Sequence, residues 1–300
     1  MPPDVSALPP ELWIRILSHH PDPVHLWSTC RILSRTWQSY VETVVSTVYL
    51  RYFASICFSL EKYNLGGKTA RPEISCTFDR FEDESADKDG TGSDKDQSNG
   101  REKFAKVMDR WEERVATSKP ETPHYTIRIG RLINDTALPG LVFSKERREI
   151  GFSWLPMIRL FFREQERLRT LKSKYHLDVR RTLESNRKKL AKGEALSPEE
   201  LPKSWASLEP DVRKSIRRVR LKEAYSDNEE MQWAIGSLKV YESSKGSDGK
   251  VVKALSEIPG AGMGERWFGS TYLIQALYLD EWSCLHGIDT KSEHLAHEAG

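Results

Sequence analysis

The stretch "HHPDPVHLWSTC", residues 19–30, concentrates side chains that could bind a metal ion. Nitrogen, oxygen and sulfur ligands hold zinc and other transition metals when about four of them converge on one point. Whether they converge depends on the secondary structure that carries them. The candidate ligands are His19, His20, Asp22, His25 and Cys30.

The sequence predicts helices on both sides of this stretch. Apolar residues between Glu11 and His20 recur with helical spacing. The prolines of "PDP" at Pro21–Pro23 end that helix and begin another, because proline cannot donate the hydrogen bonds of a continuing helix. Downstream, apolar residues recur at steps of three or four, as on a buried helical face: Leu26, Cys30, Leu33, Trp37, Val41, Val44 and Val48.

This pattern argues against a metal site. Cys30 falls on the apolar stripe, where a free cysteine behaves as a small hydrophobic residue. His25 and Cys30 are five residues apart, so on one helix they point in different directions. His19 and His20 lie at a helix C-terminus, where the helix dipole favours an imidazole without any metal. We therefore predict no metal ligands here.

Other short motifs do not predict a cofactor or a catalytic site. The acidic "DKDG" lacks the flanking helices and the terminal glutamate of a calcium loop. "GAGMGERW", from Gly260 to Trp267, lacks the glycine register and the lysine of a phosphate-binding loop. "HLAH", at His294–His297, has no evident third ligand. No residue is nominated as a nucleophile or general base, so we expect a chain that is not an enzyme and has no cofactor.

The predicted N-terminal helices carry a set of residues whose types and spacing are typical of one protein family. These are Leu8–Pro9, Glu11–Leu12, the pair Ile16–Leu17, Leu26 after the proline turn, and "LSRTW" at Leu33–Trp37. Together they make the segment from Leu8 to Glu42 resemble the F-box, and "PDPVHLWSTCR" is similar to F-box proteins of filamentous fungi. One departure is His20, where the family usually has an apolar residue.

The resemblance implies an F-box domain over residues 1–48: a three-helix unit that docks on a Skp-type linker protein and, through it, on a cullin–RING ubiquitin ligase. A unit of about 40 residues rarely buries all its apolar surface alone, which suits a docking role. Leu33 and Trp37 could instead face the rest of the chain. The residues that the resemblance places in the contact, or directly supporting it, are Leu8, Pro9, Leu12, Ile16, Leu17, Leu26, Leu33 and Trp37.

Residues 49–300 are predicted to form a substrate-recognition region with a small antiparallel sheet. Apolar residues alternate over Ala54–Leu60, Glu73–Phe81 and the segment "HYTIRIGRL", and Gly140–Phe143 could add a strand. The turn residues of "NLGGK" join the first two strands as a hairpin. Residues 82–102 are nearly devoid of apolar side chains and are predicted to be a disordered acidic insertion.

From Ser153 onward the pattern becomes helical. Ser153 is placed to cap a helix whose Trp154, Ile158, Phe161 and Leu168 share a face. A basic stretch follows and ends at a glycine, and another runs from Val212 to Lys222. Further helices are expected near residues 228–241 and 270–285. The fold class is thus α+β: a three-helix F-box, a small antiparallel sheet and a mainly helical C-terminal region.

Charge and composition limit the partners. The 46 basic and 44 acidic residues leave a net charge of +2, so the net charge does not indicate a class of binding partner. No segment reads as a signal peptide or membrane span, which predicts a cytoplasmic or nuclear protein with no membrane partner. The basic helices at 159–222 lack any known nucleic-acid motif, so we do not expect nucleic acid as the main partner.

The sequence thus leads to two functional hypotheses. The first is a substrate-recognition adaptor of an SCF-type ubiquitin ligase, which binds an unknown protein substrate. The alternative is an F-box-like scaffold or nucleic-acid-binding protein that acts through the basic helices, independent of ubiquitination. No repeat period of a common receptor domain follows the F-box-like segment, so the sequence does not identify the substrate.

Overall fold

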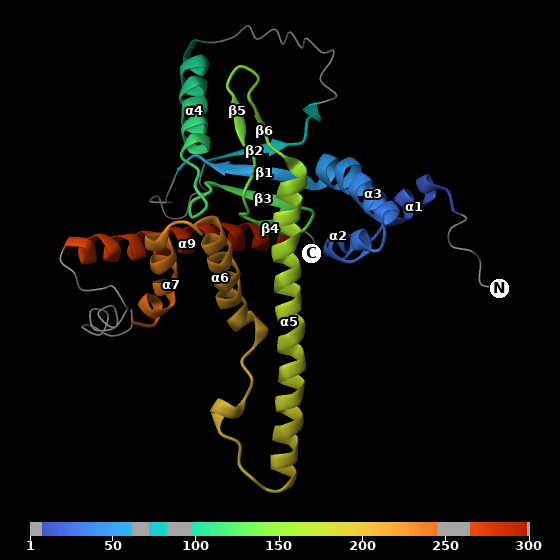
Figure 1. Cartoon of the computed structure of the whole chain (residues 1–300), viewed down its shortest axis with the longest axis vertical. Coiled ribbons are helices and arrows are strands. Elements are labelled where there is room, and N and C mark those ends of the chain that lie inside the picture. The colour runs from blue at the N-terminus through green and yellow to red at the C-terminus, as the bar shows by residue number, and fades with distance from the viewer. Residues whose placement is uncertain (1–7, 62–71, 83–97, 245–264, 299–300) are drawn as a thin grey trace. The chain divides into compact units, whose positions relative to one another are not determined.

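The computed structural model describes residues 8–61, 72–82, 98–244 and 265–298 (Figure 1). It confirms the α+β class. The chain divides into two compact units: unit 1 extends to Phe162 and includes the residues from His286 onward, and unit 2 is Arg163–Leu285. Two long helices, α5 (Trp154–Ala191) and α9 (Glu265–Glu298), each run from one unit into the other.

Unit 1 begins with three short helices: α1 (Pro10–Ser18), α2 (Pro23–Ser28) and α3 (Arg35–Val44). Proline occupies the first turn of both α1 and α2, where its missing N–H costs nothing. The Asp22 carboxylate caps α2 by accepting the His25 N–H at 3.0 Å. The Ser34 hydroxyl caps α3 by accepting the Trp37 N–H at 3.2 Å.

The predicted continuous stripe from Leu26 to Val48 is interrupted. After α2 ends, a 3₁₀ turn, η2 (Cys30–Ile32), precedes the Ser34 cap, so His25 and Cys30 lie on different elements rather than on one helix. The cap starts a new helix, and Leu33 just before it is 63% exposed instead of buried. Cys30 nevertheless packs against the core, as expected of a small hydrophobic residue.

α3 continues into a π-helix, η3 (Val45–Phe53), which leads into the sheet. The predicted strands form as β1 (Ala54–Ser59), β2 (Glu73–Thr77) and β3 (Tyr125–Ile129), and β4 (Leu132–Asn134) completes the order β2-β1-β3-β4. All neighbours are antiparallel, and β1 and β2 pair as the expected hairpin strands, whereas "NLGGK" lies outside the described residues. Ile56 lies opposite both Cys76 and Ile127, so the predicted apolar alternation faces one core.

The strand expected in Gly140–Phe143 is β5 (Val142–Ser144), which pairs with β6 (Glu149–Gly151) in a separate two-stranded sheet. A helix that was not predicted, α4 (Ser98–Ala116), starts inside the proposed acidic insertion. Residues 98–102 are therefore helical, and most of the insertion, including "DKDG", lies outside the described residues. Met108 and Trp111 bury the inner face of α4 in the core of unit 1.

One hydrophobic core joins the N-terminal helices to the sheet. The predicted boundary at residue 48 falls within η3 and inside unit 1, because side chains on both sides of it pack into the same cluster. Fully or nearly fully buried members include Leu17, Leu26, Val41, Phe58, Ile127, Ile158 and Phe161.

Unit 2 contains the remainder of α5, the 3₁₀ turn η5 (Pro198–Glu200), α6 (Trp205–Ala224), α7 (Glu229–Ser244) and α9 up to Leu285. Its core packs α6, α7 and α9 together through residues such as Leu221, Ile235, Leu238, Ile274 and Leu277. The helices expected near residues 228–241 and 270–285 are thus confirmed. α9 extends through "HLAH" to Glu298, whereas the first residues of "GAGMGERW" lie outside the described part.

The predicted start and stop of α5 are both confirmed. α5 begins directly after Ser153 and buries Ile158 and Phe161, with Trp154 and Leu168 half-buried. At the other end Gly193 has φ +80°, a left-handed conformation that favours glycine. The N–H groups of Gly193 and Glu194 donate to the carbonyls of Leu190 (3.0 Å) and Lys189 (3.1 Å), which is a Schellman stop.

Candidate partner-docking face

Large apolar side chains are exposed on α1 and just before it. Leu8, Leu12 and Ile16 follow one another at four-residue spacing, and Leu12 and Ile16 are 45% and 52% exposed. Leu17, the neighbour of Ile16, is buried in the core. α1 therefore has one face that stabilises unit 1 and another whose apolar side chains are exposed. We term the four exposed residues Leu8, Pro9, Leu12 and Ile16 the α1 set.

A second exposed apolar pair lies at the η2 turn. Ile32 is 73% exposed and Leu33 is 63% exposed, and we term these two residues the η2 pair. Single apolar residues on a surface are ordinary, whereas contiguous exposed apolar patches mark interaction sites, and these two adjacent side chains would contribute to one. Sequence reasoning included Leu33 and missed Ile32, although the two are adjacent in "CRILS".

α3 holds the α1 set in place through aromatic packing. The rings of Trp13 on α1 and Trp37 on α3 lie 5.2 Å apart and are tilted by 54°. Both tryptophans are half-buried, and Ile14 packs against the core beside them. Trp37 thus faces its own chain, one of the alternatives that the sequence left open, and it supports α1.

α3 holds the η2 turn through an ion pair. The Arg31 Nε donates to Glu42 Oε1 at 2.9 Å, and the Gln38 amide donates to the same oxygen at 3.0 Å. The Arg31 guanidinium also lies 4.6 Å from the centre of the Trp27 ring. Partial burial would raise the pKa of the Glu42 carboxyl, but hydrogen bonds from Gln38 and Arg31 and the charge of Arg31 outweigh it and hold the pKa below its ordinary value.

The predicted contact residues therefore separate into two groups. Leu17 and Leu26 are buried and Trp37 is half-buried, so these three support the surface. The exposed members are Leu8, Pro9, Leu12, Ile16 and Leu33, to which the structure adds Ile32.

Two of the histidines first considered as metal ligands make contacts that stabilise the fold. His20 Nδ1 accepts the Asp22 N–H at 3.0 Å, and the His20 ring stacks on His25 with centroids 5.4 Å apart. The His20 carbonyl accepts the Tyr49 hydroxyl at 3.1 Å, so His20 links the α1–α2 junction to η3. Within the described ranges, no group of three His, Cys, Asp or Glu residues could hold a metal ion.

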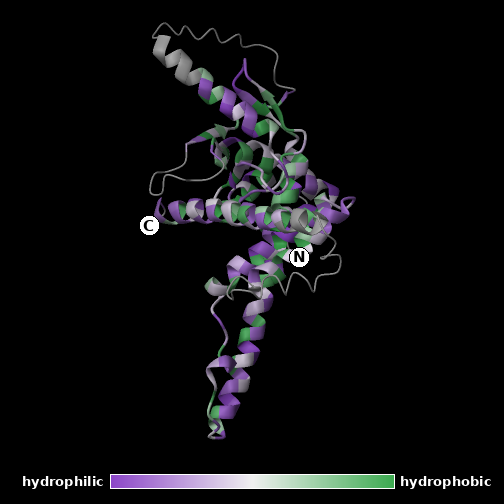
Figure 2. Cartoon of the chain, turned by 90° about the vertical axis from the view of Figure 1, so that its left-hand side faces the viewer, coloured by the Kyte–Doolittle hydropathy of each residue, from purple (hydrophilic) through white to green (hydrophobic). Residues whose placement is uncertain are grey.

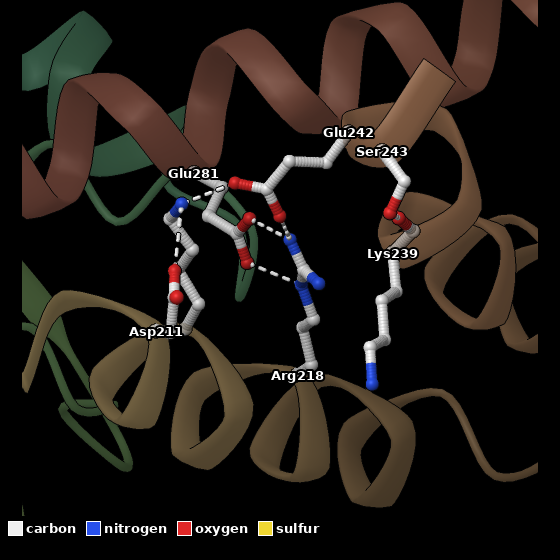
Figure 3. A network of polar contacts seen from close by, with 7 residues as sticks. Asp211, Arg218, Lys239, Glu242, Ser243 and Glu281 are labelled. Atoms are coloured by element: carbon white, nitrogen blue, oxygen red, sulfur yellow. Dashed lines mark hydrogen bonds and ion pairs between the residues drawn. The ribbon is translucent and has the colours of Figure 1, made fainter. Parts of the chain in front are cut away.

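Most basic side chains of α6 are buried or form ion pairs within unit 2. Arg217 and Arg220 are buried, and Arg220 pairs with Glu164 at 3.0 Å. Arg218 donates through Nε to Glu281 at 2.9 Å and through Nη2 to Glu242 at 3.2 Å, as Figure 3 shows. Lys214 also pairs with Glu242. These contacts bind α6 to α7 and α9, so this stretch is an internal ion-pair network rather than a charged outer surface.

The network shifts the ionisation of its members. Burial alone would lower the pKa of Arg218, but hydrogen bonds and charges from Glu281 and Glu242 raise it above its ordinary value. Burial would likewise raise the pKa of Glu242, but Lys214 and Arg218 lower it. Arg218 and Glu242 therefore both stay charged at neutral pH.

Comparison of the chain with protein-family models, curated proteins and solved structures found no match. None of the helices in the described part of the chain has the length and apolarity needed to cross a membrane.

Proposed function

We propose that this chain is the substrate-recognition adaptor of an SCF-type cullin–RING ubiquitin ligase. The α1 set and the η2 pair would bind the Skp-type linker, and the rest of the chain would bind a protein substrate in the cytoplasm or nucleus. Such an adaptor makes no bonds itself. It acts by raising the effective concentration of substrate lysines near the conjugating enzyme.

One observation carries the proposal. The F-box-like segment exposes large apolar side chains at positions where the resemblance expects linker contacts, while Leu17 and Leu26 pack inward. α3 fixes both exposed sets through Trp37 and Glu42, so a partner would meet a preformed surface. Preformed surfaces lose little conformational entropy on binding.

The alternative, a scaffold or nucleic-acid-binding protein acting through residues 159–222, has weaker support. Its α6 portion is occupied by contacts with Glu164, Glu242 and Glu281. The distal part of α5 is the remaining candidate for such a role.

Co-expression with a Skp-type linker protein, followed by size-exclusion chromatography, tests the proposal. We expect the wild type to elute as a complex and an Ile32→Ser/Leu33→Ser variant to elute apart from the linker. The matched control is Leu177→Ser/Leu183→Ser, which removes two leucines on α5 that are 54% and 51% exposed. A wild-type chain that elutes alone, or a complex that survives in the η2 variant and the control equally, would count against the adaptor role.

A further inference from the structure

The distal part of α5 is an ordered element outside the hydrophobic cores. We term residues 171–204 the basic arm: they comprise α5 from Leu171 to Ala191 and the return segment 192–204. Unit 2 builds its core from α6, α7 and α9, and no residue of the basic arm belongs to either hydrophobic core of the described chain. Core packing therefore does not explain why this element is structured.

The return segment holds one side of α5. It runs back alongside the helix (Figure 1), and the buried Asn186 side chain donates to the Glu200 carbonyl at 2.9 Å. Lys189 pairs with the Glu200 carboxylate, and the Tyr175 hydroxyl donates to the Lys203 carbonyl. Tyr175 also packs on Trp205, with ring centroids 5.4 Å apart. These contacts use one side of the helix and leave the other exposed.

The exposed side repeats a simple pattern. Leu177 lies one turn from Lys174 and from Arg181, three residues before and four after. Leu183 has the same relation to Arg180 and Arg187. Residues three and four apart are neighbours on a helix surface, so each exposed leucine lies between two cations. Hydrophilic and hydrophobic residues accordingly alternate along this part of α5 in Figure 2.

Unlike the basic residues of α6, most of the basic residues on this part of α5 are not paired with acidic side chains of the described chain. Residues 171–191 contain seven basic and two acidic residues. Within the described part of the chain, Lys174, Arg180, Arg187 and Lys188 have no acidic partner, and Arg181 has only an exposed contact with Asp178 at 3.4 Å. Exposed ion pairs of that kind contribute little.

We propose that the basic arm docks an acidic, amphipathic segment of a partner protein. Carboxylates of that segment would pair with Arg180, Arg187 and their neighbours, and its apolar side chains would cover Leu177 and Leu183. The assignment of this partner as the ligase substrate rests on the proposed adaptor function; the docking chemistry itself does not.

The pattern favours a protein over a nucleic acid. The large apolar residues exposed on the basic arm are all leucines, including Leu190 and Leu201, and they offer no ring for a base to stack on. The aromatic Tyr175 is engaged with Trp205 on the side held by the return segment. Phosphates would satisfy the cations but would leave the leucines exposed, whereas an amphipathic acidic segment satisfies both.

Fluorescence anisotropy with the full chain tests the proposal. The probe is a labelled peptide of about 20 residues in which glutamate pairs alternate with leucine, long enough to span several helical turns. The comparison probes are the same peptide with serine for leucine and a single-stranded RNA of equal length. The variants are Leu177→Ser/Leu183→Ser and Arg180→Glu/Arg187→Glu. The matched control is Lys106→Glu/Arg110→Glu on α4, which changes the net charge equally at exposed residues.

We expect the glutamate–leucine peptide to bind the wild type and the α4 control alike. Its affinity should fall about tenfold or more in the arginine variant and several-fold in the leucine variant, since charge and apolar contact both contribute. Absence of peptide binding, or binding equal in all variants, would overturn the proposal. RNA binding that exceeds peptide binding and ignores the leucine variant would also overturn it, in favour of a nucleic acid. Linker binding by the arm variants, measured separately, distinguishes failure here from failure of the adaptor role.

Discussion

Arg31 and Glu42 join the η2 turn to α3 through two hydrogen bonds on a single carboxylate oxygen, with the Nε–Oε1 distance at 2.9 Å. Both side chains are mostly buried, at 15% and 25% exposure. Arg31 directly precedes Ile32 and Leu33 in the chain. The ion pair therefore holds the η2 pair in a fixed position relative to α3.

Replacing Glu42 with alanine should weaken both the fold and linker binding. The change leaves the Arg31 guanidinium partly buried without its carboxylate, which costs about 1–3 kcal/mol of unfolding free energy. It also frees the η2 pair from its fixed position, so linker affinity should fall. Denaturant unfolding and titration calorimetry with the linker measure the two effects.

The double variant Arg31→Ala/Glu42→Ala is the control for this prediction. Removing both charges eliminates the unpaired guanidinium, so part of the lost stability should return. Equal stability of the wild type and the Glu42→Ala variant would mean that the ion pair contributes nothing to the turn.

A second prediction separates supporting residues from exposed ones. Leu26→Ala removes a fully buried side chain and should cost about 2–5 kcal/mol of unfolding free energy. Ile32→Ser changes a side chain that is 73% exposed and should alter stability by about 0.5 kcal/mol or less. Thermal and denaturant unfolding of the two variants give the comparison. Similar losses in both would show that Ile32 is covered within the folded chain.

The third prediction concerns pH and the ion pairs of Glu242. Its pKa in the folded chain lies below the ordinary glutamate value of 4.5, because Lys214 and Arg218 outweigh the effect of burial. The unfolded state therefore binds more protons in the window between the two pKa values, and stability falls as pH decreases through it. Wild type should exceed Glu242→Gln most at neutral pH, and the gap should shrink below about pH 4.5.

Unfolding midpoints of both proteins at several pH values from neutral to acidic provide the measurement. A stability gap that stays constant down to the lowest pH would contradict the assigned shift. Asp211→Asn is a suitable comparison, because its contact with Lys214 at 3.5 Å is peripheral and its carboxylate is largely exposed.

A fourth prediction concerns thiol reactivity in the sheet. Burial, with a smaller effect from Cys57, raises the pKa of the Cys76 thiol to about 12. At pH 8 only about one Cys76 in ten thousand would be a thiolate, and the thiolate is the reactive form. Iodoacetamide should therefore modify Cys76 very slowly in the native chain and readily after denaturation, as peptide mass spectrometry would detect. Rapid modification of Cys76 in the folded chain would show that β2 opens or that water reaches the thiol.

Local patterns predicted much of the fold. Alternation located β1, β2 and β3, and a single glycine with its preceding basic run located the end of α5 at Gly193. These signals succeed because a strand face or a helix stop depends on neighbouring residues in the chain. The helical spacing around the proline turn likewise located α1 and α2.

The interruption of the helix after α2 could not be predicted from the spacing of the apolar residues. Steps of three and four residues continue through Leu33, yet the Ser34 cap restarts the helix and leaves Leu33 exposed. The role of the α6 basic residues was also hidden, because their partners Glu242 and Glu281 lie 24 and 63 residues from Arg218. Only the tertiary fold distinguishes these buried cations from the exposed ones on α5.

Titration calorimetry of the purified chain with a Skp-type linker measures the dissociation constant of the proposed complex. We expect a one-to-one complex for the wild type and for the Leu177→Ser/Leu183→Ser control. Leu12→Ser/Ile16→Ser should weaken it about a hundredfold or more, since each apolar side chain contributes roughly 1.5–3 kcal/mol when buried. No binding by the wild type, or an unchanged dissociation constant for the α1 variant with its fold intact, would rule out α1 as the linker-docking face.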